Sequence, residues 1–226
     1  MTRQAIIVAG GRGTRMNNEV PKQFLPLCGK PIVMHTLETF YNFDSHIELI
    51  LVLPEHLMVY WQNLCVKHQF DIPHHIVAGG QERFYSVKNG LVFAKPNALI
   101  AIHDGVRPFV SHSTLERCFA QAELQGNAIP AMPLVDSIRE IKLNENQIVD
   151  RTKLRAIQTP QVFQSQIITN AFEQPFSPTF TDDASVVEAY GENIHLVEGN
   201  VENIKLTTPF DLLIGEALFN NSKSSS

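Results

Sequence analysis

Short apolar runs alternate with longer amphipathic stretches through the first half of the chain, and this alternation predicts strands that take turns with helices. Strands are expected at residues 5–9, 47–53, 74–77 and 99–103, and helices at residues 31–41, 55–69, 81–94 and 113–125. The run 5–9 is apolar throughout and β-branched in its middle, which is typical of a strand covered on both faces. Because repeated strand-helix-strand units favour right-handed crossovers, we predict an α/β fold whose mostly parallel sheet is flanked by helices.

The pattern changes after residue 128. A strand is expected at 128–134, and residues 135–157 form alternating segments around the polar centre 143–147, which predicts a β-hairpin. Because a hairpin with little apolar surface of its own is marginally stable, we expect a protruding arm that packs on a second copy of the protein. The remaining pattern predicts helices at 165–176, 183–191 and 209–219 and strands at 194–197 and 203–206.

Composition and charge narrow the class of protein. We assign residues 1–220 to one domain and the polar, serine-rich residues 221–226 to a disordered tail. The net charge of −5 argues against a nucleic-acid or membrane partner, which would need a basic face. Three widely spaced cysteines indicate reduced thiols and a cytoplasmic location. The first strand begins too early for a signal peptide, and no apolar run approaches membrane-spanning length.

A glycine turn rich in cations follows the first strand. Glycines let backbone amides approach an anion, and the turn Gly10-Gly11-Arg12-Gly13 is followed by Arg15 and Lys22. It is not a dinucleotide fingerprint, because Met16 stands where the third glycine belongs, and no Gly-Lys-Ser/Thr triplet completes a Walker loop. The turn indicates a different kind of phosphate site; the alternative is a plain glycine turn with surface arginines.

Three polar stretches follow predicted strands: residues 10–22, 79–86 and 104–108. In sheets of this class, ligands bind outside the carboxyl ends of the strands. We therefore expect the three stretches to meet at one binding site.

A set of motifs in fixed order carries a family resemblance: residues 9–16 (AGGRGTRM), 21–23 (PKQ), 104–108 (DGVRP), 159–161 (TPQ), 181–185 (TDDAS) and 203–205 (NIK). The chain resembles the 2-C-methyl-D-erythritol 4-phosphate cytidylyltransferases from about residue 4 to 219. The resemblance implies a single Rossmann-like nucleotidyltransferase domain, a homodimer with exchanged arms, a Mg²⁺ requirement, and transfer of a cytidylyl group from CTP to a sugar-alcohol phosphate in non-mevalonate isoprenoid synthesis.

The resemblance also assigns residues to roles. It implies that Arg15 and Lys22 stabilise the transition state, and that Lys205 and the partner's copy of Arg151 hold the acceptor phosphate. The remaining assignments are acceptor hydroxyls for Asp104, Arg107 and Ser137, and nucleotide contacts, mainly through the backbone, for Ala9, Gly10, Gly11, Gly80, Gln81 and Ser86. Mg²⁺ would bridge triphosphate oxygens, with Asp104 as the one protein acid proposed beside it. The pair Asp182-Asp183 could mimic a metal site, but a helix N-terminus also favours acids, so we interpret it as a helix cap.

Two other functions stay open at this point. Ribitol-5-phosphate cytidylyltransferases share most of the motifs, although residues 150–159 (DRTKLRAIQT) favour the methylerythritol enzymes. A CTP sensor without turnover is an alternative of a different class, and the presence of both Arg15 and Lys22 argues against it.

No general base is expected, because a phosphate monoester with a second pKa near 6 is already largely dianionic at neutral pH.

Overall fold

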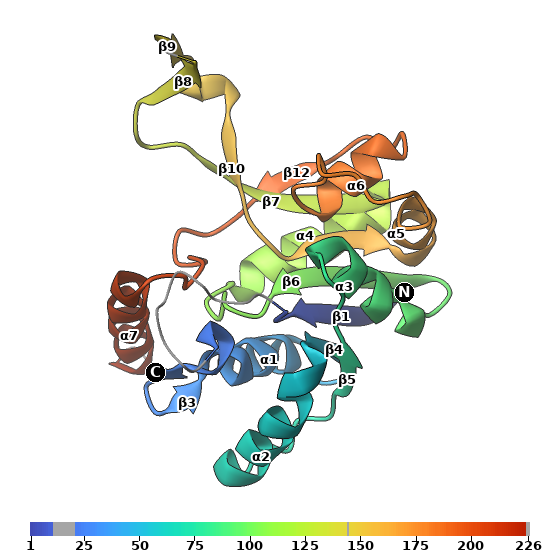
Figure 1. The fold of residues 1–226 in the computed structure, drawn as a ribbon, viewed down its shortest axis with the longest axis vertical. Helices are drawn as coiled ribbons and strands as arrows, with labels where there is room; N and C mark the ends of the chain where they lie inside the picture. Colours follow the sequence, from blue (N-terminus) through green and yellow to red (C-terminus); the bar gives the residue numbers. More distant parts are fainter. Residues whose placement is uncertain (11–20, 144, 225–226) are drawn as a thin grey trace.

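The computed structural model describes residues 1–10, 21–143 and 145–224, with side chains up to residue 221. One central sheet organises the chain, with strand order β10-β7-β11-β6-β1-β4-β5 and β12 beside β7 (Figure 1). Strand β1 (Thr2–Val8) lies between β6 (Ala98–Asp104) and β4 (Glu48–Leu53), parallel to both, and β4 is parallel to β5 (His75–Ala78). The predicted α/β fold with a mostly parallel sheet is confirmed.

The rest of the sheet is mixed. Strand β11 (Gln161–Gln164) runs antiparallel to both β6 and β7 (Asn127–Pro133). Strand β7 also pairs with β12 (Leu196–Glu198) in parallel and with β10 (Arg155–Ile157) in antiparallel. A small β2-β3 ribbon (Pro26–Leu27 and Lys30–Pro31) lies apart from this sheet.

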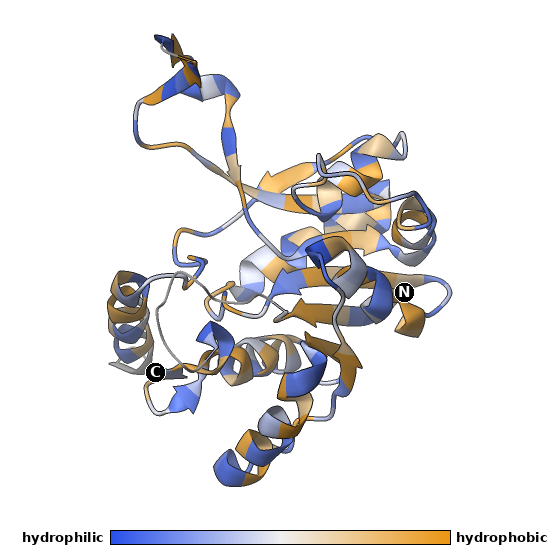
Figure 2. Cartoon of the chain, in the orientation of Figure 1, coloured by the Kyte–Doolittle hydropathy of each residue, from blue (hydrophilic) through white to orange (hydrophobic). Residues whose placement is uncertain are grey.

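Helices cover both faces of the sheet, which gives two hydrophobic cores. Residues of α1 (Ile32–Phe43), α2 (Met58–His68) and α4 (His112–Gln125) contribute to one core, and residues of α3 (Arg83–Gly90), α5 (Ser165–Ala171) and α6 (Asp183–Ala189) to the other. Ile7 points into the first core and Ile6 into the second. This alternation explains why the first strand is apolar at successive positions, and Figure 2 shows the hydrophobic colours concentrated on the central strands.

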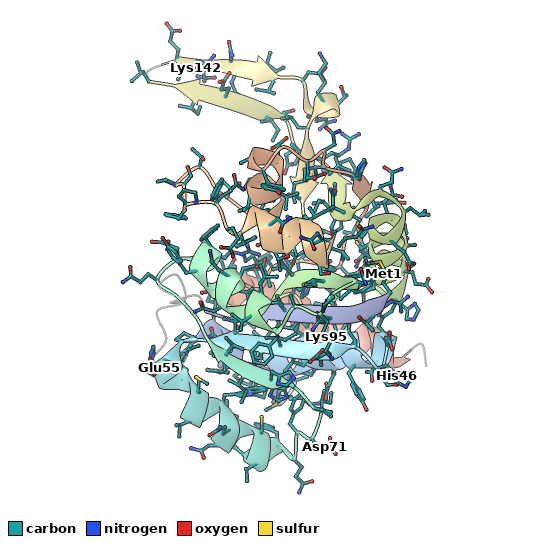
Figure 3. All side chains as sticks on the ribbon, turned by 90° about the vertical axis from the view of Figure 1, so that its right-hand side faces the viewer. Met1, His46, Glu55, Asp71, Lys95 and Lys142 are labelled. Atoms are coloured by element: carbon teal, nitrogen blue, oxygen red, sulfur yellow. The ribbon has the colours of Figure 1, made fainter. Side chains whose placement is uncertain are left out.

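The predicted hairpin forms an arm that stands away from the body (Figures 1 and 3). Strands β8 (Ile138–Lys142) and β9 (Glu145–Val149) pair in antiparallel, and Lys142 lies near the tip, where Figure 3 labels it. Short 3₁₀ turns occupy Lys22–Phe24, Glu55–Leu57, Leu91–Phe93 and Arg151–Lys153. No helix in the described part of the chain is long and apolar enough to cross a membrane.

Some predicted element bounds and one predicted strand are wrong. The capping-box spacing of Ser113 and Glu116 predicts a helix cap at Ser113, but α4 is capped by Ser111, whose Oγ accepts from the N–H of Thr114 at 3.1 Å. Helix α5 ends at Ala171 and not near 176, because Pro175 follows and the Gln174 amide donates to the Ala171 carbonyl. Residues 203–206 are not a strand: the Leu206 N–H donates to Val106, but no ladder forms.

The last helix, α7 (Pro209–Ser224), runs beyond its expected end near residue 219. No glycine or proline follows Gly215, so nothing in the sequence ends the helix there. Residues 221–224, which the composition predicts to be disordered, are therefore helical.

Candidate active site

A cleft of about 820 Å³ opens at the carboxyl ends of the parallel strands. The sheet register brings these ends together, since Val8 lies opposite both Val52 of β4 and Asp104 of β6. Figure 3 places Glu55, which lines the cleft, at the opposite end of the sheet from Met1. The lining includes eight residues singled out from the sequence: Ala9, Gly10, Lys22, Gly80, Gln81, Ser86, Asp104 and Lys205. Gly11 and Arg15 lie outside the described residues.

One end of the cleft is built from backbone. The Ala9 N–H donates to Val52 and the Gly79 N–H to Leu53, which ties both glycine turns to the end of β4. The Gly80 N–H donates to Ser86 Oγ at 3.1 Å, and this hydroxyl lies 3.2 Å from the Glu82 carbonyl, to which it donates. Ser86, in the first turn of α3, therefore shapes the loop 79–82, whose backbone groups can read a base edge.

Gly80 cannot carry a side chain in this loop. A Cβ added at Gly80 would lie 2.3 Å from Cβ of Tyr85, far closer than two carbons approach in proteins. The residue is therefore glycine because the Tyr85 side chain approaches it closely.

Gln23 is a site residue that the sequence analysis did not assign. It is buried, and its amide donates to the Ala9 carbonyl at 2.9 Å, so it joins the Lys22–Phe24 turn to the end of β1. Because this hydrogen bond holds the turn against the end of β1, the neighbouring Lys22 lies at the cleft.

A cluster of charges occupies the other end of the cleft. Asp104 Oδ2 lies 3.0 Å from Lys205 Nζ and 3.2 Å from Arg107 Nε, and Asp104 Oδ1 lies 4.0 Å from Arg83 Nε. Burial by itself would raise the pKa of Asp104, but the three cations outweigh it and hold the pKa well below its usual range. Asp104 is therefore ionised at neutral pH and positions cations.

Arg83 and Asp183 were missed by the sequence analysis as a pair. The Arg83 guanidinium donates to both carboxylate oxygens of Asp183, each at 2.6 Å, and Asp183 is 1% exposed. The expected cap is confirmed at Asp182, which forms a capping box with Ser185 at the start of α6. The position of Arg83, directly after a glycine loop at the end of a strand, could have indicated a site residue. Its partner Asp183 could not be found in this way, because it lies 100 residues away in the sequence.

His103 and Thr159 fix the strand that carries Asp104. The Asp104 N–H donates to Thr159 Oγ1 at 3.1 Å, and His103 lies 3.0 Å from this hydroxyl through Nδ1 and 2.9 Å from the Arg107 carbonyl through Nε2. A carbonyl only accepts, so Nε2 carries the proton and Nδ1 accepts from Thr159. Burial lowers the pKa of His103 to about 4, which keeps the ring neutral.

Three assigned residues do not line the cleft. Arg107 contacts Asp104 but is not among the residues that line the cleft. It donates to the Asn203 carbonyl at 2.7 Å, which joins it to the segment that carries Lys205. Ser137 and Arg151 are exposed in the arm region of the same chain. The guanidinium of Arg151 donates to the carbonyl of Val135, at the base of the arm.

The described residues do not supply a protein cage for a metal ion. Among them, no three histidine, cysteine or acidic side chains are grouped to hold one. Asp104 is a poor ligand, because both of its oxygens already face cations. A Mg²⁺ ion here would have to take its ligands mostly from phosphate and water.

Comparisons with known proteins agree on one family. Residues 4–221 match the family described as 2-C-methyl-D-erythritol 4-phosphate cytidylyltransferase. A relative of that name from Bacteroides fragilis is 51% identical over 218 residues, which cover 96% of this chain and 100% of the relative. Another from Clostridium botulinum is 40% identical, covering 96% of this chain and 98% of the relative.

Solved structures give the same result. The 4-diphosphocytidyl-2C-methyl-D-erythritol synthase from Anaerococcus prevotii matches with a TM-score of 0.81 at 27% identity, covering 97% of this chain and 96% of that one. The 2-C-methyl-D-erythritol 4-phosphate cytidylyltransferase from Thermus thermophilus matches with a TM-score of 0.78 at 28% identity, covering 96% and 98%. The chain therefore belongs to the 2-C-methyl-D-erythritol 4-phosphate cytidylyltransferase family.

Proposed function

We propose that the cleft described above is the active site, and that fixed cations on its two sides bring a nucleotide and an acceptor phosphate together. As a member of its family, the chain is a nucleotidyltransferase. It transfers the cytidylyl group of CTP to 2-C-methyl-D-erythritol 4-phosphate, which gives 4-diphosphocytidyl-2-C-methyl-D-erythritol and pyrophosphate. The observation that carries the proposed site is that Lys22 and Lys205, far apart in sequence, line one cleft with the glycine loops.

The cytidylyl transfer needs fixed positive charge in the site rather than a general base. An oxygen of the acceptor phosphate forms a bond to the α-phosphorus of CTP, and the bond from that phosphorus to the pyrophosphate oxygen breaks. Negative charge builds up on the α-phosphoryl oxygens and the leaving group, and preorganised cations stabilise it. We assign this role to Lys22 and to Arg15. We assign the cytosine to the backbone of Ala9, Gly10, Gly11, Gly80 and Gln81, in the loops that Ser86 and Gln23 shape.

Lys205 is assigned to the acceptor phosphate. It lines the cleft, and an ammonium has three donors, so it can keep its contact with Asp104 and still bind an anion. Arg107 and Asp104 lie beside it, where acceptor hydroxyls would come. A dianionic phosphate needs a second cation in this position, and Arg151 of a partner subunit would supply it, with Ser137 of the arm nearby.

The exposed apolar side chains of the arm support the dimer that this assignment requires. Val135, Ile141 and Ile148 are 83%, 71% and 77% exposed on a hairpin that has no core of its own. An isolated two-stranded hairpin is marginally stable, so burial against a second copy would stabilise it. We also propose Mg²⁺, held by the triphosphate and water, as the cofactor, and a cytoplasmic location.

Pyrophosphate release is the experiment that tests the function. The purified chain is mixed with CTP, Mg²⁺ and either 2-C-methyl-D-erythritol 4-phosphate or ribitol 5-phosphate. We expect release with the first acceptor and little with the second. Pyrophosphate release with ribitol 5-phosphate alone would instead indicate a ribitol-5-phosphate cytidylyltransferase. CTP binding without pyrophosphate release in the presence of either acceptor would favour a sensor.

A further inference from the structure

Arg83 is in the cleft but is engaged by protein groups on both sides. It is the first residue of α3, directly after the loop 79–82. Its two terminal nitrogens are taken by the buried Asp183, and its Nε faces Asp104 at 4.0 Å. The same two carboxylates raise the pKa of Arg83 against the opposing effect of burial, so its charge is permanent. Arg83 is therefore a fixed charge beside Asp104.

Asp104 contacts the Lys205 ammonium, which the proposed mechanism assigns to the acceptor phosphate. Its Oδ2 lies 3.0 Å from Lys205 Nζ and 3.2 Å from Arg107 Nε, so Asp104 and an acceptor phosphate would share the Lys205 ammonium, and a stronger hold by Asp104 would weaken its bond to the phosphate. Among the described residues, three cations face this carboxylate: Lys205, Arg107 and Arg83. When one cation is removed, its repulsion of the other two is lost, so the carboxylate holds those two more tightly. Removing Arg83 should therefore strengthen the hold of Asp104 on Lys205.

We propose that Arg83 is a positioning residue for the acceptor phosphate: by facing Oδ1 of Asp104 it limits the pull of this carboxylate on Lys205 and leaves the ammonium available to the acceptor. This inference rests on the proposed function, because it takes Lys205 as the acceptor-phosphate residue. Arg83 acts through Asp104 and Lys205 and does not itself touch the reacting atoms.

The nucleotide loop does not depend on Arg83 for its shape. Gly79 donates to the Leu53 carbonyl at 2.7 Å, and the Ser86 N–H donates to the Glu82 carbonyl at 3.1 Å. Gly80 is bound by the Ser86 hydroxyl. A change at Arg83 should therefore alter acceptor binding much more than CTP binding, which a general loss of structure would not do.

The test variant replaces the buried pair as a unit. Arg83→Gln alone would leave Asp183 buried and unpaired, which destabilises proteins strongly. The double variant Arg83→Gln/Asp183→Asn removes one positive and one negative charge, so the net charge of the cluster is kept, and two amides can still hydrogen-bond. Arg3→Gln/Asp44→Asn is the matched control, because that ion pair of 3.2 Å lies at the amino end of β1, away from the cleft.

Steady-state kinetics with each substrate varied in turn give the first readout. For Arg83→Gln/Asp183→Asn we expect the KM for 2-C-methyl-D-erythritol 4-phosphate to rise on the order of tenfold, the effect of disturbing a charge group at a binding site, while the KM for CTP changes less than about threefold. Arg83→Lys, which keeps the charge, should restore most of the acceptor KM, and the control should match the wild type. An unchanged acceptor KM, or an equal rise in both KM values, overturns the inference.

Lysine acylation gives a second readout that needs no turnover. A limiting amine-reactive ester labels the apo protein, and mass spectrometry compares Lys205 with Lys95, which pairs with Glu48 far from the cleft. We expect Lys205 to react several-fold more slowly in the double variant, because Asp104 holds it more tightly, while Lys95 is unchanged. Equal or faster labelling of Lys205 overturns the inference. If the wild type releases no pyrophosphate, the proposed function fails, but the labelling still decides how Arg83 acts on Lys205.

Discussion

At the scale of single residues, the cleft depends on cations whose neighbours fix them in place. Lys22 belongs to a turn that Gln23 ties to the end of β1, whereas Lys205 is held by a carboxylate. Both lysines thus line the cleft, but they are assigned to different steps, Lys22 to the transition state and Lys205 to binding of the acceptor phosphate. This difference predicts different consequences when each is removed.

Lys22→Ala should lower kcat far more than it changes either KM. Removal of one preorganised donor at the site of developing charge lowers kcat by about 10²–10³-fold, and the glycine loops that are assigned to the nucleotide remain. Steady-state pyrophosphate release measures both parameters. Lys95→Ala, at the other end of the sheet, is the matched control and should keep wild-type rates; a KM loss as large as the kcat loss in Lys22→Ala would contradict the transition-state role.

His103 should make folding stability depend on pH. Burial lowers the pKa of this ring to about 4 in the folded protein, whereas an unfolded histidine titrates near 6.5. Between these values the unfolded chain binds the additional proton, so stability is complete above pH 6.5 and is lost as the pH falls toward 4, by about 3 kcal/mol in total. The lowered pKa of Asp104 acts in the same direction, but mainly once the pH falls into the range where an unfolded aspartate titrates, near 4, and below it.

Urea unfolding at several pH values between 4 and 7 measures this dependence. His103→Gln keeps a donor and an acceptor on the side chain but does not titrate. We expect its stability to vary less over this range than that of the wild type. A variant whose stability falls as steeply as the wild type would show that other groups cause the effect.

At the scale of elements, local patterns predict where an element lies better than where it begins. Ser113 stands three residues before Glu116, which is the spacing of a capping box, whereas Ser111 stands three residues before Thr114 and is nevertheless the cap. The side chain of Asn200 decides between them, because it accepts from the Ser111 N–H at 3.1 Å and from the Thr114 hydroxyl at 3.2 Å. This contact spans more than 80 residues, which no local pattern contains.

The cap can be tested with a matched pair of variants. Ser111→Ala should lower the free energy of unfolding by about 1 kcal/mol, the usual effect of losing a side-chain cap. Ser113→Ala removes the same hydroxyl from a residue two positions later and should change stability much less. Urea denaturation of both variants measures the difference; equal losses would contradict the assignment of the cap to Ser111.

At the scale of the whole molecule, the mostly parallel sheet could be predicted from strand-helix alternation, and the ends of the apolar runs indicated which stretches meet at one edge, but the order of the strands was not predicted. The charge cluster could not be predicted in the same way. Arg83 meets Asp183 from another helix, and His103 meets Thr159 across 56 residues, and such partners depend on the completed packing. The arm was predicted from its alternating segments and its small apolar surface. Its contacts with a second copy could not be predicted, because they depend on the partner chain.

Mixed dimers can show whether the arm completes the site of its partner. Arg15→Ala and Arg151→Ala chains are each expected to be inactive alone. If Arg151 crosses to the partner's cleft, one of the two sites in a hybrid dimer has both arginines intact, so random pairing should restore about a quarter of wild-type activity. Arg15→Ala mixed with Lys22→Ala is the control: both residues are assigned to the cleft of their own subunit, so every hybrid site should lack one of them and no activity should return. No recovery with Arg151→Ala would place Arg151 in the site of its own subunit, and recovery in the control would show that Arg15 and Lys22 do not act in the same cleft.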